Sequence, residues 1–481
     1  MSEEAVKQKN SIPGSAVVAK AGIWYTICNF LFRGMAFITT PVFTRLMSKS
    51  ELGAFSNYSS WVSILLVVVS FDLAQSVIRS KLEHGNDMDC YIWSILSFST
   101  ISTLIWYGIV LLFPDFFCSL FRVEMKYIHL MFAYFLVAPA YQMLITRHRA
   151  FYKYKLFVLI TGIAIVTSTV LSVFFVMTWE DKFSGRAFGY YLPYIVMGAV
   201  IYVSMVLKGR RIKMDYWKYA CVICLPLVPH VLSLYLLSSS DKLIVTRLCG
   251  EEYTAIYSVA YSAYHITTIL FDSMNKAWAP WLLDSLQQEN YDQIRKTSKI
   301  YIAVFALIAV GILMLVPEII LVLGGRSYRG AVYCLPPLVT SCVFQFIYTM
   351  YVNIEFFRKK TVGVAVATMI ATAANIILNF IFIPMNPEYG YVIAAYTTLA
   401  GYVILFILHY IMVRRMKLDF VYDIRYIIVI LVMILLISGI MNRLYTVNAV
   451  RWILIVLYGC GVLCLVMRNG KKIIGVLRKR H

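Results

Sequence analysis

The sequence predicts an all-α integral membrane protein with about fourteen transmembrane helices. Hydrophobic residues make up 61% of its 481 residues, and the mean hydropathy is +0.75. One water-exposed domain of this length does not hide so much apolar surface. Apolar stretches of about 20 residues, the length that crosses about 30 Å of hydrocarbon as a helix, also follow one another along the whole chain.

These stretches define predicted helices 1 to 14 in chain order. The connections between them are short, which leaves no room for a soluble catalytic or nucleotide-binding domain. Gly470 and Lys471 are followed by Lys472 instead of the Ser or Thr of a phosphate-binding loop, so we expect no ATP hydrolysis. The predicted helices lie near residues 17–41, 53–78, 90–113, 127–146, 156–178, 188–207, 217–240, 254–275, 300–323, 331–357, 361–384, 390–413, 425–442 and 449–467.

The distribution of Lys and Arg predicts the topology. The termini and the loops after even-numbered helices hold about 30 of the 44 Lys and Arg residues, so the positive-inside rule places both termini in the cytoplasm. The first 16 residues lack the apolar core and cleavage site of a signal peptide, so we expect helix 1 to be retained. Anionic lipid headgroups beside the basic loops account for the net charge of +20, and we expect no nucleic-acid partner.

Two sequence patterns could indicate an enzyme active site or a metal site, but the evidence for each is weak. The Asp87-Met88-Asp89 pair resembles the metal-binding carboxylates of glycosyltransferases, but it sits in a short loop beside Lys81 and His84, without a second acidic cluster. The ten cysteines lie mostly inside apolar helices, away from the His and further Cys that a four-ligand metal site needs. We therefore expect neither enzyme activity nor a bound metal or cofactor.

An internal repeat indicates a duplicated chain. The segment from Ser238 to Ser258, laid without gaps on the chain 202 residues earlier, places Thr246-Arg247-Leu248 on Thr44-Arg45-Leu46. It also places Tyr257-Ser258 on Phe55-Ser56. In both copies an apolar helix leads into Thr-Arg-Leu, a short polar turn and a new apolar helix. Each copy lies between the first and second helix of its own half of the chain.

Predicted helix 1 carries a polar stripe. Arg33 lies well inside the apolar span, where a cation costs at least about 2.5 to 3.5 kcal/mol. At 100° per residue, the polar residues fall on one face of the helix. We expect this polar face to point toward a cavity, because it would be unfavourable against lipid. An ion pair with Asp72, placed on predicted helix 2, is the alternative. The stripe consists of Gly22, Thr26, Asn29, Arg33 and Thr40.

Predicted helices 7 and 8 each carry a second polar face. On helix 8, Tyr257, Tyr261 and Tyr264 recur at helical spacing with His265 beside them. Tyrosine rings stack on sugars while their hydroxyls form hydrogen bonds, so this face suits a glycan. Ordinary packing is the alternative in a chain with 35 tyrosines. Helix 7 aligns Pro226, His230, Ser233 and Asp241 on one face. Pro226 and Pro229 interrupt this helix without ending it, as in transporter hinges.

Three acidic residues are candidates for ion coupling. Asp72, Asp241 and Asp272 lie within or beside apolar spans, where a carboxylate needs a partner. They either bind a coupled H⁺ or Na⁺ or form structural pairs, and the sequence leaves both alternatives open.

The passages ITTPVFTRLMSKSELGAFS and SSSDKLIVTRLCGEEYTAIYSVAY resemble the two best-marked segments of bacterial polysaccharide flippases. These are the O-antigen and capsule repeat-unit translocases of the multidrug/oligosaccharidyl-lipid/polysaccharide exporter superfamily. The resemblance implies two pseudo-symmetric six-helix lobes around a central cavity, plus two C-terminal helices. The implied activity is alternating-access transfer of undecaprenyl-diphosphate-linked oligosaccharide to the outer leaflet of the cytoplasmic membrane. Arg33, with Asn29 and Thr26, would contact the diphosphate.

The resemblance also implies a division of the chain and further partners. Helices 13 and 14 are expected to line a groove for the lipid tail, and helix 8 departs from the family by offering Asp272 and His265 in place of an arginine. Polymerase and chain-length proteins of the same pathway are expected partners. The expected parts are a cytoplasmic N-terminus at 1–16, an N-lobe at 17–207, a basic linker at 208–218, a C-lobe at 219–413, helices 13 and 14 at 414–467 and a basic tail at 468–481.

Two other functions compete with the flippase. A cation-coupled small-molecule exporter of the same superfamily shares the fold but usually has twelve helices and an acidic N-lobe, so the two additional helices and Arg33 count against it. A membrane polysaccharide polymerase usually carries a large outward loop, whereas the outward loops predicted here are short.

Overall fold

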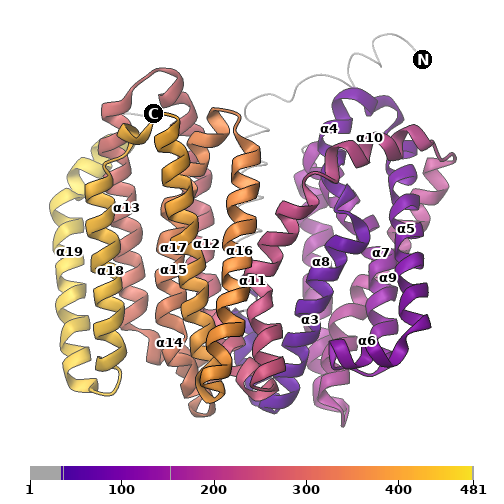
Figure 1. Ribbon diagram of the computed structural model, residues 1–481, viewed down its shortest axis with the longest axis horizontal. Coiled ribbons are helices and arrows are strands. Elements are labelled where there is room, and N and C mark those ends of the chain that lie inside the picture. The colour runs from indigo at the N-terminus through magenta and orange to yellow at the C-terminus, as the bar shows by residue number, and fades with distance from the viewer. Residues whose placement is uncertain (1–33, 36, 152, 479–481) are drawn as a thin grey trace. The chain divides into compact units, whose positions relative to one another are not determined.

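The computed structural model describes residues 34–478 apart from positions 36 and 152, and every regular element in this part of the chain is a helix (Figure 1). The chain forms two compact units. Unit 1 comprises the residues up to 269 together with 365–394, and unit 2 comprises 270–364 and the residues from 395 onward. The predicted all-α fold class is confirmed.

Unit 1 is a bundle in which α8 packs along α9, and α9 also contacts α5 and α7. Gly185 and Gly189 make the α8–α9 approach close, because a Cβ atom at Gly189 would lie 2.4 Å from the Cα of Ser172 on α8. Its helices are α3 (Lys49–Ser70), α4 (Ser76–His84), α5 (Met88–Leu112), α6 (Pro114–Phe121), α7 (Met125–Ala150), α8 (Tyr154–Thr178), α9 (Lys182–Gly209), α10 (Met214–Cys224), α11 (Val228–Leu248), the first half of α12 (Glu251–Gln287) and most of α16 (Thr361–Phe382).

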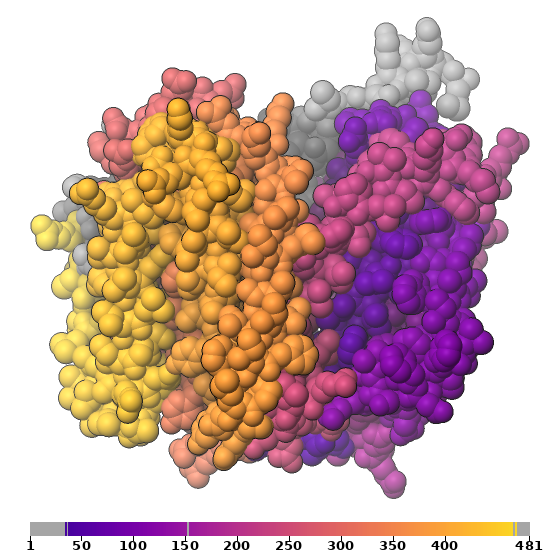
Figure 2. All heavy atoms as spheres, viewed as in Figure 1, coloured from indigo at the N-terminus to yellow at the C-terminus, as the bar shows by residue number. Residues whose placement is uncertain are grey.

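Unit 2 has its core around α15, in which Leu335 to Ser341 are all buried. The helix α13 packs against both α15 and α18, and α19 packs against α13 and α18. Figure 2 shows α18 and α19 on the surface of this unit, in yellow. Its helices are the second half of α12, α13 (Tyr291–Met314), α14 (Val316–Gly324), the 3₁₀ segment η3 (Arg326–Tyr333), α15 (Leu335–Phe357), α17 (Gly390–Arg415), α18 (Ile424–Leu444) and α19 (Asn448–Arg478).

Several predicted helices are interrupted. Predicted helix 2 ends at Ser70, because Phe71 and Asp72 adopt positive φ angles of 51° and 48°. Predicted helix 9 is two helices, α13 and α14. The expected proline break in helix 7 is confirmed, since α10 and α11 meet at an angle of 54°.

The helix lengths support a multi-pass membrane protein. Among the described residues, ten helices are long and apolar enough to cross a membrane, or up to eleven if the bent α10–α11 pair is one span. The larger count of about fourteen, with its division into two lobes, stays a prediction. Predicted helix 8 extends further than expected, because α12 continues through Pro280 to Gln287.

Candidate functional site

Unit 1 contains a cavity of about 460 Å³ that is rich in hydroxyl groups. Its walls come from the helical residues 37–46 and from α3, α8, α9, α11 and α12. None of the described residues that line it is acidic. The polar and aromatic lining residues are Thr39, Thr40, Phe43, Phe55, Ser56, Ser59, Ser63, Ser168, Thr169, Arg186, Tyr190, Tyr191, Tyr194, Lys242, Ser258, Tyr261, Ser262 and His265.

Arg186 brings the first positive charge to this cavity. The glycines at 185 and 189 turn one face of α9 toward α8, and Arg186, Tyr190 and Tyr194 follow at four-residue spacing on the face that lines the cavity. The Arg186 Cζ atom lies 3.4 Å from the ring centroid of Phe43 and 4.7 Å from that of Phe55. Its Nε atom is buried and has no hydrogen-bond partner among the described residues.

Lys242 brings the second positive charge, from α11. Its Nζ atom lies 4.7 Å from the ring centroid of Tyr261 on α12. In the described part of the chain, neither Lys242 nor Arg186 forms an ion pair with a carboxylate. The two cations are held by aromatic faces, which leaves their charges available to an anion.

The preceding residue, Asp241, is fully buried and serves a different network. Its carboxylate accepts hydrogen bonds from the Tyr257 hydroxyl at 2.8 Å and from the Asn379 side-chain amide at 2.7 Å. Asn379 lies 3.5 Å from Asn375, one turn earlier on α16. Asp241 therefore joins α11, α12 and α16 within unit 1.

The internal repeat lines the cavity from both of its copies. At the separation of 202 residues found in the sequence, Thr40 corresponds to Lys242 and Ser56 to Ser258. Continuing in the same register, Ser59 corresponds to Tyr261 and Ser63 to His265. All of these residues line the cavity. Equivalent positions of the two copies therefore face one shared space.

A second hollow of about 210 Å³ adjoins this cavity, because Ser63, Tyr190 and Tyr191 line both. Its remaining polar lining differs in charge, since it includes a carboxylate and an amide. These residues are Ser70, Asp72, Tyr134, Gln142 and Tyr235. The combined space thus has a cationic part and a part with hydrogen-bond acceptors.

The chain matches a known protein family. The family described as "Polysaccharide biosynthesis protein" matches residues 18–286, which is more than half of the chain. The chain belongs to this polysaccharide biosynthesis family. A relative from the Lsg locus of Haemophilus influenzae is 21% identical over 393 residues, covering 78% of this chain and 94% of its own length.

Solved structures agree with the family assignment at the level of the fold. A lipid II flippase, MurJ, in an inward closed conformation has a TM-score of 0.68 at 16% identity, covering 94% of this chain and 100% of its own. An inward-facing multidrug resistance transporter of the MATE family has a TM-score of 0.59 at 13% identity, covering 82% and 99%. The resemblance to polysaccharide flippases of this superfamily, inferred from the sequence, is confirmed.

The structure brings some of the predicted site residues of this family member together. Tyr261 and His265 line the cavity, and their rings lie 5.1 Å apart. Tyr257 and Tyr264 do not line it: both are buried, and Tyr257 binds Asp241. The predicted residues Arg33, Asn29 and Thr26 lie outside the described residues.

The predicted ion-coupling carboxylates lie in three different settings. Asp241 is in the buried network of α11. Asp72 does not belong to a helix as expected, because it occupies the turn after α3, where Gln75 donates a hydrogen bond to it at 3.2 Å. Asp272 lies in the unit 2 part of α12 and is half-buried.

Sequence reasoning did not single out Arg186 or Lys242. Lys242 had a detectable signal, since it occupies the position that the repeat pairs with Thr40, a member of the predicted polar stripe. The sequence signal for Arg186 was weaker. Arg186 precedes predicted helix 6, a position typical of a charged residue at the membrane–water interface. The start of α9 at Lys182 brings it into the helix.

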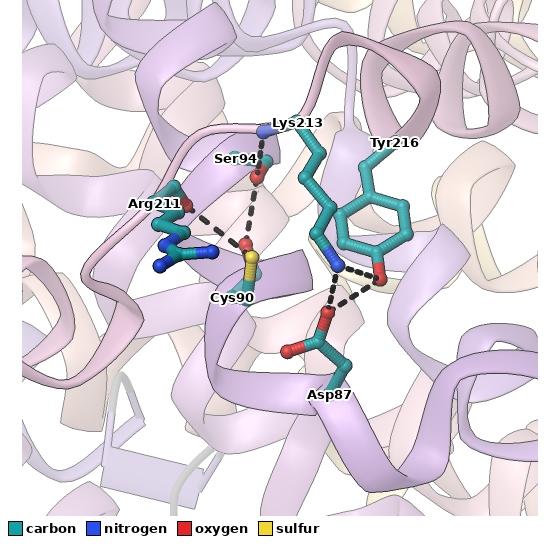
Figure 3. Close-up of polar contacts among 6 residues, drawn as sticks. All are labelled: Asp87, Cys90, Ser94, Arg211, Lys213 and Tyr216. Atoms are coloured by element: carbon teal, nitrogen blue, oxygen red, sulfur yellow. Dashed lines mark hydrogen bonds and ion pairs between the residues drawn. The ribbon is translucent and has the colours of Figure 1, made fainter.

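The Asp87-Met88-Asp89 pair forms two separate ion pairs instead of a metal site. Asp87 binds Lys213 at 2.5 Å and accepts a hydrogen bond from Tyr216 at 2.7 Å (Figure 3). Asp89 binds Arg147 at 2.5 Å. The hydrogen bond with Asp87, aided by that with Tyr216, raises the pKa of Lys213. No group of three His, Cys, Asp or Glu residues that could hold a metal occurs among the described residues.

Proposed function

We propose that this protein is a flippase that moves undecaprenyl-diphosphate-linked oligosaccharide repeat units from the inner to the outer leaflet of the cytoplasmic membrane. One observation carries the proposal: a cavity lined by both repeat copies holds Arg186 and Lys242 without a neutralising carboxylate among the described lining residues. Membership of the polysaccharide biosynthesis family supports the glycan part of the substrate.

The positive charges of the cavity match the diphosphate, which is the part of such a substrate that crosses the membrane least easily. A diphosphate cannot enter hydrocarbon without its hydration shell, so two fixed cations lower the barrier by replacing lost water. Arginine is suited to phosphate oxygens because its donors form a planar fork. The unpartnered Nε of Arg186 offers one donor within this cavity.

The sugars are expected to occupy the adjoining hollow. Tyr134 and Tyr235 provide ring faces there, and Gln142 and Asp72 provide acceptors for sugar hydroxyls. The acyl chain stays in the membrane, where the exposed apolar surface of α18 and α19 is the expected lipid groove.

The coupling ion is proposed to bind at Asp241. This buried carboxylate accepts hydrogen bonds from an amide and a phenol, and its oxygens are the atoms that would take up either a proton or Na⁺. Asp72 and Asp272 remain the alternative positions. The inner-membrane location, the cytoplasmic termini and the pathway's polymerase and chain-length partners belong to the same proposal.

The test is the leaflet location of the lipid-linked repeat unit. Its sugar is labelled from the outer face in cells that lack the protein and that express wild type, Arg186→Gln or Lys242→Gln. We expect each substitution to lower outer-face labelling by about tenfold, the effect of losing one charge-assisted contact. Arg149→Gln on α7 and Lys208→Gln on α9 remove exposed charges and serve as matched controls. Arg33→Ala and Arg33→Lys test the predicted contact on helix 1.

The outcomes separate the flippase from its alternative. Normal outer-face labelling without the protein contradicts the flippase and favours a small-molecule exporter, for which the MATE-like fold is compatible. A cationic drug needs a negatively charged cavity. If the protein is a small-molecule exporter, we therefore expect Arg186→Gln and Lys242→Gln to leave export of the drug intact. Loss of labelling in the control variants as well would contradict the assignment to this cavity.

A further inference from the structure

A second polar cavity, of about 540 Å³, lies in unit 2 and has no part in the site described above. It is enclosed by α14, η3, the α18–α19 turn and the first turn of α19. The cavity lies where α18, a helix long enough to cross a membrane, ends and α19 begins, which is the level at which headgroups of lipids are found. Its central residue is a buried arginine, Arg451.

Arg451 is only 2% exposed, yet it is not fully satisfied. It donates to both carboxylate oxygens of Glu318, each at 2.5 Å, and to the carbonyl of Met314 at 3.2 Å. Its Nε atom is buried without a hydrogen-bond partner among the described residues. The pair with Glu318 is neutral, so the remaining donor of Arg451 is available to a ligand in the cavity.

A second cation gives the cavity its net charge. Arg329 is exposed on η3, lines the cavity and forms no ion pair with a described carboxylate. The side chains of Asn448 and Thr446 add polar groups. The first N–H groups of α19 have no acceptor within their own helix. Together these groups suit a phosphate that carries one negative charge.

The rim of the cavity is apolar and exposed. Leu321 and Trp452 line the cavity and are 51% and 48% exposed, and Ile453 and Val456 continue the exposed surface along α19 at 61% and 60%. A soluble anion gains nothing from this surface, whereas acyl chains do. Tryptophan is typical of the level at which headgroups meet hydrocarbon.

We propose that this cavity binds the phosphodiester headgroup of an anionic phospholipid, whose acyl chains lie along α14 and α19. Arg329 and the free donor of Arg451 contact the phosphate, and Trp452 packs beside the glycerol and the first methylenes. This site is independent of the flippase proposal, because it needs neither the cavity of unit 1 nor a transported substrate.

The experiment measures lipid retention by native mass spectrometry of the full-length protein. The probes are phosphatidylglycerol and phosphatidylcholine, offered in detergent to wild type, Arg329→Gln and Arg326→Gln. We expect phosphatidylglycerol to be retained over phosphatidylcholine, and Arg329→Gln to lower its occupancy about tenfold. Arg326 is exposed on the same 3₁₀ segment but does not line the cavity, so Arg326→Gln is expected to match wild type.

Two further arms make the proposal falsifiable. Arg329 and Arg326 are both exposed, so replacing either one leaves no cavity in the core. An unchanged thermal midpoint confirms that the variants fold. Glycerophosphoglycerol, which lacks acyl chains, and inorganic phosphate are added as competitors. Displacement of the lipid by either at similar concentration would show a soluble-anion site and overturn the proposal, as would equal retention by Arg329→Gln and wild type.

Discussion

Arg186 and Lys242 hold their charges in different ways, and this difference sets what each can do. The guanidinium of Arg186 is packed against three aromatic rings, with its Cζ atom 3.4 Å from the centroid of Phe43. The ammonium of Lys242 has one ring contact, with Tyr261 at 4.7 Å. We infer that Arg186 is a fixed anchor, whereas Lys242, on a flexible stem, follows a moving phosphate.

Asp423, at the start of α18, allows a prediction of pH dependence. The Lys299 ammonium, 2.6 Å away, and the backbone N–H of Tyr426 hold the pKa of Asp423 below its usual value. A lowered carboxyl pKa stabilises the fold above the unfolded pKa of about 3.9, and this contribution is lost as the pH falls through the folded pKa. We expect wild type to have a higher thermal midpoint than Asp423→Asn at pH about 6, and the gap to narrow at pH about 3.5.

Asparagine keeps the helix cap, so this comparison isolates the ionic contribution. Asp292→Asn removes an exposed carboxylate from α13, the helix that carries Lys299, and is expected to leave the midpoint unchanged at both pH values. A gap between wild type and Asp423→Asn that is equal at the two pH values would show that the ion pair contributes nothing.

The candidate site could be predicted only in part. The helical spacing of the tyrosines led to Tyr261 and His265, because periodicity identifies a face of a helix. The spacing does not distinguish residues that line the cavity from residues that are buried in the core. It therefore groups Tyr257 with Tyr261 and His265, although the Tyr257 hydroxyl binds Asp241. Arg186 could not be found from spacing, since its exposure depends on how α9 packs on α8.

At the scale of the helix, hydropathy predicted spans well and breaks poorly. Predicted helices 5, 11, 12 and 13 agree with α8, α16, α17 and α18 to within about two residues. The break at Phe71 and Asp72 was not predicted. Both are non-glycine residues with positive φ angles, a conformation that tertiary packing imposes and that sequence patterns do not indicate. The proline break between α10 and α11 was predictable, since proline removes a donor wherever the helix lies.

The segment between α9 and α10 is fastened to α5, which leads to a prediction about local opening. The Lys213 amide donates to the Ser94 hydroxyl at 3.0 Å, while its side chain binds Asp87 (Figure 3). Lys213→Met removes the ionic contact, so we expect amide hydrogen exchange across residues 210–216 to become several-fold faster. Mass spectrometry of peptides from this segment measures the change.

Lys218→Met is the matched control, because Lys218 is an exposed lysine one turn further along α10. It is expected to leave the exchange of residues 210–216 unchanged. Equal protection in Lys213→Met and wild type would mean that packing, including the hydrogen bond from Trp217 to the Ser94 carbonyl at 2.6 Å, holds the segment alone.

For the whole molecule, the two copies of the repeat contact each other within unit 1. The Ser50 hydroxyl of the first copy donates to the Glu251 carboxylate of the second at 2.6 Å. Arg122, which follows α6 and lies outside both copies, donates to the carbonyl of Thr246 in the second copy at 2.8 Å. A Cβ atom at Gly53 would lie 1.8 Å from the backbone oxygen of Glu251, so only glycine permits this approach. Under alternating access, this contact has to open in each transport cycle.

Crosslinking tests that requirement. In a background in which the ten native cysteines are replaced, Ser50→Cys with Glu251→Cys is expected to form a disulfide with oxidant and to lose most outer-face labelling of the lipid-linked glycan. Reductant is expected to restore it. Each single cysteine variant is the control and should keep its activity under oxidant. Full activity of the crosslinked protein would exclude opening at this contact.

The bend between α10 and α11 has a consequence for the surrounding bilayer. In a continuous helix, the carbonyl oxygens of Val222 and Leu225 would accept from residues 226 and 229, but both positions are proline and have no N–H. An oxygen without a donor costs several kcal/mol in hydrocarbon. We therefore expect water or a neighbouring polar group to satisfy these oxygens, so that the aqueous boundary reaches inward to the depth of the bend.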